Sequence, residues 1–248
     1  MDSPHLSVLV PAYNGEDRLP GALAELSRWM DTLPYTTELI LLDDYSRPPA
    51  EKILADFAKG RQNTRVIRNE TNLGKGATVG RGMLAAKGKY RVFTDADLAY
   101  PPPEIGKILA DLEAGADVAI ACRVLPESRY LMSPSFFHYL YTRHVMSRVF
   151  NLMVRTVLLR GIFDTQAGLK GFTAMAADTV FPRLTIPRFG FDVEALFIAQ
   201  QHGFQVKQTA VHFRYDEEPT TITFTQSVFR MMADLLQVRM NHLRGRYR

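Results

Sequence analysis

Two carboxylates lie two residues apart in Asp95-Ala96-Asp97, directly behind the apolar run at residues 90–94. Carboxylate oxygens are the ligands that Mg²⁺ and Mn²⁺ prefer, and sites for nucleotide diphosphates hold the cation through one or two carboxylates plus phosphate and water oxygens. The triplet therefore indicates metal-dependent chemistry on a nucleotide-activated substrate. Because Asp-x-Asp also occurs in ordinary loops, the surrounding sequence has to decide between the two interpretations.

Polar residues follow three other strand-like runs. Tyr13-Asn14 comes after residues 6–10, Asp43-Asp44 after residues 38–42, and Asn69 after residues 65–67. In open α/β sheets, ligands bind beyond the carboxyl ends of the strands. Four such clusters at one edge therefore predict a single site. Asp43-Asp44 alone leaves two alternatives open, a helix cap or turn or hydrogen bonds to a base or ribose.

Gly74-Lys75-Gly76 precedes a helical pattern. A glycine-containing turn at a helix N-terminus can approach a phosphate closely, and the lysine adds positive charge. The alternative is a plain turn at the start of a helix. A dinucleotide-binding fingerprint would place its glycines after the first strand, where this chain has Pro11-Ala12-Tyr13-Asn14, so a dehydrogenase is not favoured.

Charged groups in the second half could serve an anionic acceptor. Arg143, Ser147 and Asn151 are four residues apart and share one helical face, which would offer a cation, a hydroxyl and an amide to a phosphate. A solvated basic stripe, a membrane-surface helix and a packed core helix are the alternatives. Asp192 follows two phenylalanines, and it either acts as a general base with a raised pKa or caps a helix.

The elements that must position these groups alternate along the first half. Strand-like runs are predicted at 6–10, 38–42, 65–67, 90–94 and 117–121, with helices at 16–33, 49–59, 76–87 and 103–113. This alternation predicts an α/β fold with a mostly parallel central sheet and helices on both faces. Further on we expect a helix at 135–159, a loop at 164–172 followed by a short strand, a helix at 191–202, a strand at 206–213 and a helix at 224–243.

The 248 residues, of which 46% are hydrophobic, suffice for a substantial core. We expect one catalytic domain at 1–215, including an amphipathic helical segment at 134–160, and a basic amphipathic helix within 216–248. The single cysteine, Cys122, excludes an internal disulfide and favours a reducing compartment.

No signal-peptide pattern and no apolar stretch of roughly 20 residues stands in the sequence. The net charge of +4 favours an anionic partner. Nucleic acid is the least favoured of these partners, because lysine and arginine are spread along the chain rather than clustered. The sequence therefore predicts a cytoplasmic protein, peripheral at the inner face of an anionic membrane. The oligomeric state stays open.

Taken in order, these motifs resemble one family. Pro11-Ala12-Tyr13-Asn14, Leu42-Asp43-Asp44, Gly74-Lys75-Gly76 and Asp95-Ala96-Asp97 resemble the inverting family 2 glycosyltransferases of the GT-A (Rossmann-like) fold. Ala121-Cys122-Arg123, the Arg143 group, and the segments 164–172 and 189–194 are similar to the dolichyl-phosphate or polyprenyl-phosphate hexosyltransferases, nearest their glucosyltransferase branch. The resemblance spans residues 6–215.

The motifs and the resemblance together imply a set of site residues. Asp97, helped by Asp95, is the predicted ligand of Mg²⁺ or Mn²⁺. The predicted catalytic residues are Asp97, Asp192, Arg123 and Arg143. The predicted acceptor ligands are Arg123, Arg143, Ser147, Asn151, Gln166 and Lys170. The predicted ligands of the donor nucleotide are Pro11, Tyr13, Asn14, Glu16, Asp43, Asp44, Gly74, Lys75, Gly76, Asp95 and Ala96.

The implied activity is metal-dependent, inverting transfer of a hexose, foremost glucose from UDP-glucose, to a polyprenyl or dolichyl phosphate or another membrane lipid. The related mannose synthases carry glutamine at the positions of Ala99 and Asp192, and both differences argue against that activity. One alternative is transfer from GDP-mannose or another sugar nucleotide to a non-lipid hydroxyl, with Asp192 as the base. The other is a non-catalytic protein that binds a nucleotide or a lipid phosphate.

Overall fold

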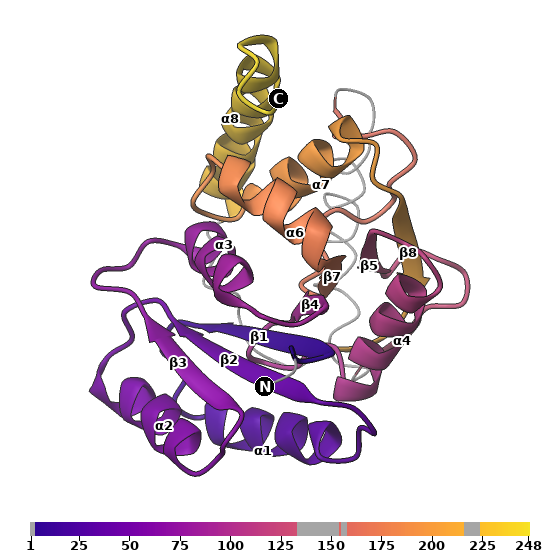
Figure 1. Ribbon diagram of the computed structural model, residues 1–248. Helices are drawn as coiled ribbons and strands as arrows, with labels where there is room; N and C mark the ends of the chain where they lie inside the picture. The colour runs from indigo at the N-terminus through magenta and orange to yellow at the C-terminus, as the bar shows by residue number, and fades with distance from the viewer. Residues whose placement is uncertain (1–2, 133–153, 155–157, 216–223) are drawn as a thin grey trace.

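A seven-stranded sheet runs through the protein (Figure 1). The computed structural model describes residues 3–132, 154, 158–215 and 224–248. The strand order is β3-β2-β1-β4-β7-β5-β8, and only the two pairings made by β7 are antiparallel. The strands are β1 (Leu6–Ala12), β2 (Thr37–Asp43), β3 (Thr64–Arg68), β4 (Tyr90–Phe93), β5 (Val118–Cys122), β7 (Lys170–Thr173) and β8 (Val206–Ala210).

Helices cover both faces of this sheet, which confirms the predicted α/β architecture. On one face lie α1 (Leu19–Met30), α2 (Pro48–Lys59) and α4 (Pro102–Glu113); on the other lie α3 (Lys75–Ala85), α6 (Ala174–Val180), the 3₁₀ turn η2 (Phe181–Arg183) and α7 (Phe191–Gln201) (Figure 1). Side chains of a strand alternate between these faces. In β1, Val8 and Val10 accordingly pack with α1, whereas Leu9 packs with α3. Burial on both faces explains why β1, β2, β4 and β5 are mainly apolar.

The structure differs from the sequence prediction at the segment 206–213. A single strand was expected, but the chain leaves the main sheet after β8 and continues as β9 (His212–Tyr215). β9 pairs in parallel with β6 (Arg129–Met132) to form a separate two-stranded sheet. Val211, between the two strands, is buried, and its N–H donates to Ser128 Oγ at 3.1 Å. This tertiary hydrogen bond marks a break that the apolar pattern does not reveal.

The strand β7 lies inside the sheet, between β4 and β5. Its sequence, Lys-Gly-Phe-Thr, has no strand-like periodicity, and the short strand expected after residue 172 begins earlier, at Lys170. Gly171 allows α4 to pack tightly, since a Cβ there would lie 2.6 Å from Ile108 Cγ2. The chain then enters α6, which the sequence did not predict, with Thr173 Oγ1 accepting from Ala176 N at 3.2 Å as the N-cap.

The predicted helix at 135–159 and the residues Arg143, Ser147 and Asn151 fall outside the described residues, apart from positions 154, 158 and 159. The helix α8 spans Phe224–Leu243. The division into a domain at 1–215 and a helix within 216–248 stays a prediction. Over the part of the chain that is described, no helix combines the length and the apolar character needed to cross a bilayer.

The last residues of the chain are bound to α7 through Glu194. This fully buried carboxylate accepts from Thr185 N and Ile186 N at 2.9 Å each, and from the hydroxyls of Thr185 and Tyr247 at 2.6 Å each. Burial, and then the hydrogen bond to Glu194, raise the pKa of Tyr247, so its hydroxyl stays a donor. Tyr247, near the C-terminus, and the segment at residues 185–186 before α7 are therefore held by the same carboxylate.

We predict that Tyr247→Phe lowers the free energy of unfolding by about 2 kcal/mol, because it removes one donor from a buried carboxylate. Urea denaturation followed by circular dichroism measures this change. Tyr13→Phe is the control, since the Tyr13 side chain is 57% exposed, and its stability should stay within about 0.5 kcal/mol of wild type. Equal stability of Tyr247→Phe and wild type would contradict the prediction.

Candidate active site

The four polar clusters meet at one edge of the sheet, as their order along the chain predicts. β1, β2, β3 and β4 are parallel, and the register aligns Ala12 with Asp43 and Asp43 with Arg68. The turns that follow are joined to one another. Asn14, whose φ is 57°, donates from its backbone N–H to Ser46 Oγ at 2.9 Å and accepts from Arg47 N at 3.0 Å. Pro11, Tyr13 and Glu16 lie in β1 and the turn beyond it.

Asp43 is fully buried at the end of β2. One of its oxygens accepts from Ser46 N at 2.8 Å, and the other is paired with the guanidinium of Arg68. The same guanidinium lies 5.3 Å from the centroid of the Tyr45 ring. Tyr13 and Tyr45 stay more than half exposed at the ends of β1 and β2. This corner thus offers exposed aromatic rings beside a rigid pair of charged groups.

Asp44 determines the shape of the loop before α3. Its carboxylate accepts from Asn69 Nδ2 and Leu73 N at 2.8 Å and from Gly74 N at 2.9 Å. Gly74 has φ +92°, a conformation that favours glycine, and a Cβ there would lie 2.7 Å from Pro187 O. All three bonds of the carboxylate are to the protein itself. Asp44, predicted as a donor ligand, therefore holds the loop that presents Lys75.

Lys75, the first residue of α3, is paired with Asp95: Nζ lies 2.5 Å from Oδ1. Burial lowers the pKa of Lys75, but the charges of Asp95, Asp192 and Asp97 outweigh it and the net shift is upward. The lysine is therefore held in its charged form. At the same helix start, a Cβ on Gly76 would lie 2.6 Å from Phe191 Cβ, so the loop packs directly against the beginning of α7, which carries Asp192.

Asp97 lies just beyond Asp95 and accepts from Ala99 N at 3.0 Å. Although part of the residue is exposed, the surrounding protein atoms and then the charge of Asp95 raise the pKa of its carboxyl. The two carboxylates therefore repel each other, and the positive charges of Lys75 and Arg18 offset only part of the upward shift in the pKa of Asp97. A cation near Asp97 would relieve the remaining negative charge.

This pair fits a hard divalent cation. Within the described residues, no cluster of three or more His, Cys, Asp or Glu side chains could hold a metal ion by itself. Mg²⁺ at nucleotide sites uses one or two carboxylates and takes its other ligands from phosphate and water. Asp95 and Asp97, with Ala96 between them, supply that kind of incomplete oxygen set, which suits a cation shared with a diphosphate.

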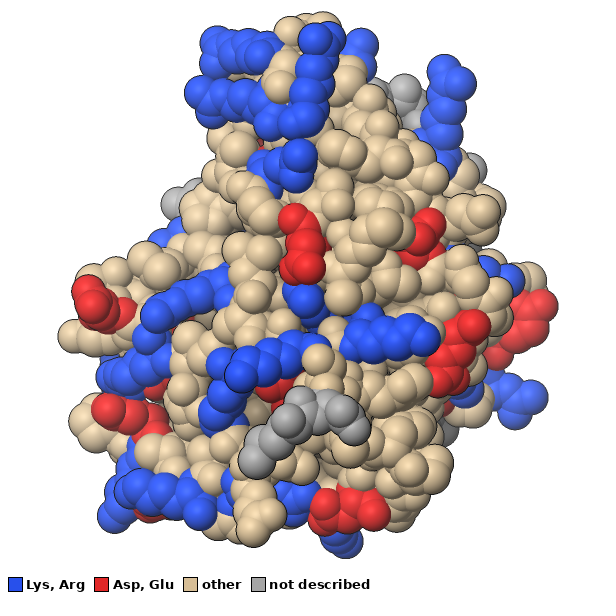
Figure 2. Space-filling view, viewed as in Figure 1, with Lys and Arg blue, Asp and Glu red and all other residues tan. Residues whose placement is uncertain are grey.

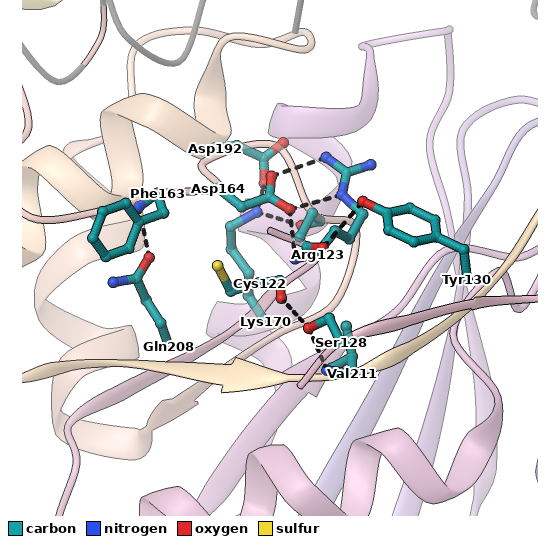
Figure 3. Close-up of polar contacts among 11 residues, drawn as sticks. Cys122, Arg123, Ser128, Tyr130, Phe163, Asp164, Lys170, Asp192, Gln208 and Val211 are labelled. Carbon is teal, nitrogen blue, oxygen red and sulfur yellow. Dashed lines mark hydrogen bonds and ion pairs between the residues drawn. The ribbon is translucent and has the colours of Figure 1, made fainter. Parts of the chain in front are cut away.

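Arg123 follows β5 and is fixed by Asp164 (Figure 3). Nε and Nη2 of the arginine donate to the two carboxylate oxygens at 2.7 and 2.9 Å, and the backbone N–H of Arg123 donates at 3.0 Å. Burial raises the pKa of Asp164, but Arg123 outweighs it and the net shift is downward, so the pair is ionised. The guanidinium is thus held in one orientation, with Nη1 on the side away from Asp164.

Asp164 is the main site residue that sequence reasoning left without a role. It is the first residue of the segment 164–172, which was predicted as a loop and which carries part of the family resemblance. A buried aspartate is informative once its partner is known, but 41 residues separate it from Arg123. Gln166 lies two residues further on in the same segment and is partly buried.

Lys170 forms a buried ion pair with Asp192 (Figure 3). Its Nζ lies 2.5 Å from Asp192 Oδ1 and donates to Ala167 O at 2.5 Å. Burial lowers the pKa of Lys170, and Asp192 opposes that shift. The sequence predicts Lys170 as an acceptor ligand, whereas the structure leaves it no exposed surface and directs its ammonium to Asp192. Asp192, paired in this way, is poorly suited to act as a base.

Comparisons with the sequences of known proteins identify the family. The family model for glycosyl transferase family 2 matches residues 7–181. The dolichyl-phosphate beta-glucosyltransferase of Dictyostelium discoideum is 31% identical over 99% of this chain and 77% of its own length. The human protein of the same name is 33% identical over 100% of this chain and 79% of its own length.

Solved structures show the same fold. Glucosyl-3-phosphoglycerate synthase from Mycobacterium tuberculosis, in complex with Mn²⁺, UDP and glucosyl-3-phosphoglycerate, aligns with a TM-score of 0.66 at 18% identity, over 95% of this chain and 80% of that one. The same synthase with Mg²⁺ and UDP gives a TM-score of 0.68. The fold is thus the predicted GT-A fold. With most of its length matched by the family model, the chain belongs to glycosyl transferase family 2 and is a glycosyltransferase.

Proposed function

We propose that this protein transfers glucose from UDP-glucose to dolichyl phosphate or a similar polyprenyl phosphate, with inversion at the anomeric carbon. The observation that carries the proposal is the similarity, at 31–34% identity over 99–100% of this chain and 77–79% of their length, to four relatives that are each named dolichyl-phosphate beta-glucosyltransferase. UDP-glucose is an α-glycoside, so a β-linked product requires attack on C1 from the face opposite the leaving diphosphate.

On the donor side, Asp97 and Asp95 would hold Mg²⁺ or Mn²⁺, which when bound neutralises charge on the leaving diphosphate. Lys75 remains charged beside Asp95 and adds a second cation to the same region. Asp44 keeps the loop before Lys75 in place. The exposed rings of Tyr13 and Tyr45 border the corner where the nucleotide base would lie.

The acceptor side favours a phosphate over a hydroxyl. A phosphate monoester is already anionic near neutral pH, so its attack needs orientation rather than deprotonation by a general base. Arg123, ionised and oriented by Asp164, suits an anionic acceptor. Asp192 is occupied by Lys170 instead of being poised to take a proton. Arg143, Ser147, Asn151 and Gln166 stay predicted acceptor ligands.

Radiolabelled sugar transfer tests this function. The purified protein is incubated with Mn²⁺ or Mg²⁺, with UDP-glucose or GDP-mannose as the donor, and with dolichyl phosphate or dolichol as the acceptor. We expect labelled lipid from UDP-glucose with dolichyl phosphate, and none with dolichol. Preference for GDP-mannose would contradict the donor. Binding of UDP with Mn²⁺ but no transfer to any acceptor would instead support a non-catalytic binding protein.

We predict that Asp97→Ala lowers the transfer rate by roughly a thousandfold, because stabilisation of a leaving group by a metal is worth several kcal/mol. The fold should remain intact, since the Asp97 side chain bonds only to the nearby Ala99 N among the interactions described. Asp56→Ala, on the exposed face of α2, is the control and should keep full activity. A folded Asp97→Ala protein with undiminished turnover would contradict the assignment of Asp97 as a metal ligand.

A lipid acceptor requires contact with a membrane, and we propose that α8 provides it. Leu236, Met240 and Leu243 are all exposed, and their spacing of four and three residues places them on one helical face. Exposed arginines accompany them at positions 239, 244 and 246. Figure 2 shows basic side chains gathered at the end of the molecule where Figure 1 places α8. Exposed apolar side chains among basic ones are typical of a helix that lies on an anionic membrane.

We predict that the triple variant Leu236→Ser, Met240→Ser, Leu243→Ser binds vesicles containing phosphatidylserine at least about tenfold more weakly, because burying each such side chain contributes about 1.5–3 kcal/mol. Vesicle co-sedimentation measures the binding, and 0.5 M NaCl should weaken the wild type as well. Leu84→Ser, which alters an exposed leucine on α3, is the control. Equal sedimentation of the triple variant and wild type would refute the surface. The expected location at the inner face of the membrane stays a prediction.

A further inference from the structure

Gly168 lies where the segment 164–172 comes closest to Asp95. A Cβ built on Gly168 would lie 2.5 Å from Cγ of Asp95 and closer still to its Oδ2. Gly168 is not among the residues with positive φ, so its backbone conformation is open to other residues. The reason for a glycine here is therefore steric, because the Asp95 carboxylate occupies the position that a side chain would take.

The Asp95 carboxylate is held from its other side as well. Its Oδ1 is paired with Lys75 Nζ at 2.5 Å, while Oδ2 faces the backbone of Gly168. A side chain at position 168 would have to push the carboxylate aside. Because the aspartate side chain is short, that displacement would change its distance from both Lys75 and Asp97.

The segment 164–172 cannot easily withdraw, because bonds on both sides of Gly168 hold it. Asp164 is joined to Arg123 by three hydrogen bonds. After the glycine, Leu169 O accepts from Ala121 N at 3.0 Å, and Lys170 is buried against Asp192. Ala167 and Leu169, on either side of Gly168, are both fully buried. A clash at Gly168 would thus be relieved at Asp95 rather than by movement of the backbone.

We propose that Gly168 is a positioning residue of the donor site, which by lacking a side chain sets the place of the Asp95 carboxylate and thereby the affinity for UDP with a divalent cation. This role deepens the proposed function and rests on it for the identity of the donor. It also connects the two halves of the site, since the segment that orients Arg123 for the acceptor is the one that borders Asp95.

The test compares UDP binding by wild type and Gly168→Ala, using isothermal titration calorimetry over a series of Mn²⁺ concentrations. Mutations that disturb the orientation of a metal ligand typically weaken metal affinity 10–100-fold, so we expect UDP affinity at a fixed Mn²⁺ concentration to fall about tenfold or more. Gly106→Ala is the control: its new methyl would lie 3.7 Å from Trp29, an ordinary contact on α4, and UDP affinity should not change.

A double-mutant cycle separates this role from a merely structural one. In an Asp95→Ala background the carboxylate that a Cβ would meet is gone, so Gly168→Ala should cause no further loss of UDP affinity. Unchanged affinity in the single variant, or the same loss in both backgrounds, would overturn the proposal.

Folding supplies a second readout of the same contact. If Gly168→Ala fails to fold, the double variant should fold again, and its failure to do so would likewise count against the contact with Asp95. The cycle uses UDP and Mn²⁺ alone. A wild type that makes no glucosyl lipid, while Gly168→Ala still loses UDP affinity, would contradict the proposed acceptor and leave the role of Gly168 supported.

Discussion

The site depends on compensation of negative charge at one edge of the sheet. Asp95, Asp97 and Asp192 all act on the charge of the Lys75 ammonium, and carboxylates gathered in this way repel one another and attract cations. Lys75 compensates part of this negative charge, because its ammonium contacts Asp95 and also interacts with the charges of Asp97 and Asp192. Lys170 compensates the charge of Asp192 through their ion pair. Negative charge remains beside Asp97, and a divalent cation bound together with a diphosphate would compensate it.

The antiparallel strand β7 makes this arrangement possible. β7 enters the sheet between β4 and β5, so the residues that precede it pass over the ends of both strands. From that single segment, Asp164 reaches Arg123, Gly168 borders Asp95, and Lys170 pairs with Asp192. Donor and acceptor groups are therefore positioned by one stretch of chain, and its geometry links the two sides of the reaction.

Support for the site extends well beyond the residues that would meet substrate. Asp44 shapes the loop that carries Lys75, and Gly76 lets that loop pack on the start of α7. α7 is in turn held by Glu194, whose four hydrogen bonds include one from Tyr247 near the C-terminus. Rigid support of this kind suits a reaction whose groups must be aligned to within fractions of an ångström.

The sequence by itself determined the alternation of strands and helices and the edge where polar clusters gather, because apolar runs and strand-end residues are local signals. It also pointed to Asp95 and Asp97, whose spacing is local too. Only the tertiary structure decided which distant residues meet. Three pairs illustrate this: 41 residues separate Asp164 from Arg123, 22 separate Lys170 from Asp192, and 73 separate Gly168 from Asp95. Nothing local in the sequence marks the members of each pair as neighbours. Partner choice at such separations follows from strand order, above all from the insertion of β7, and strand order is a property of the packed sheet.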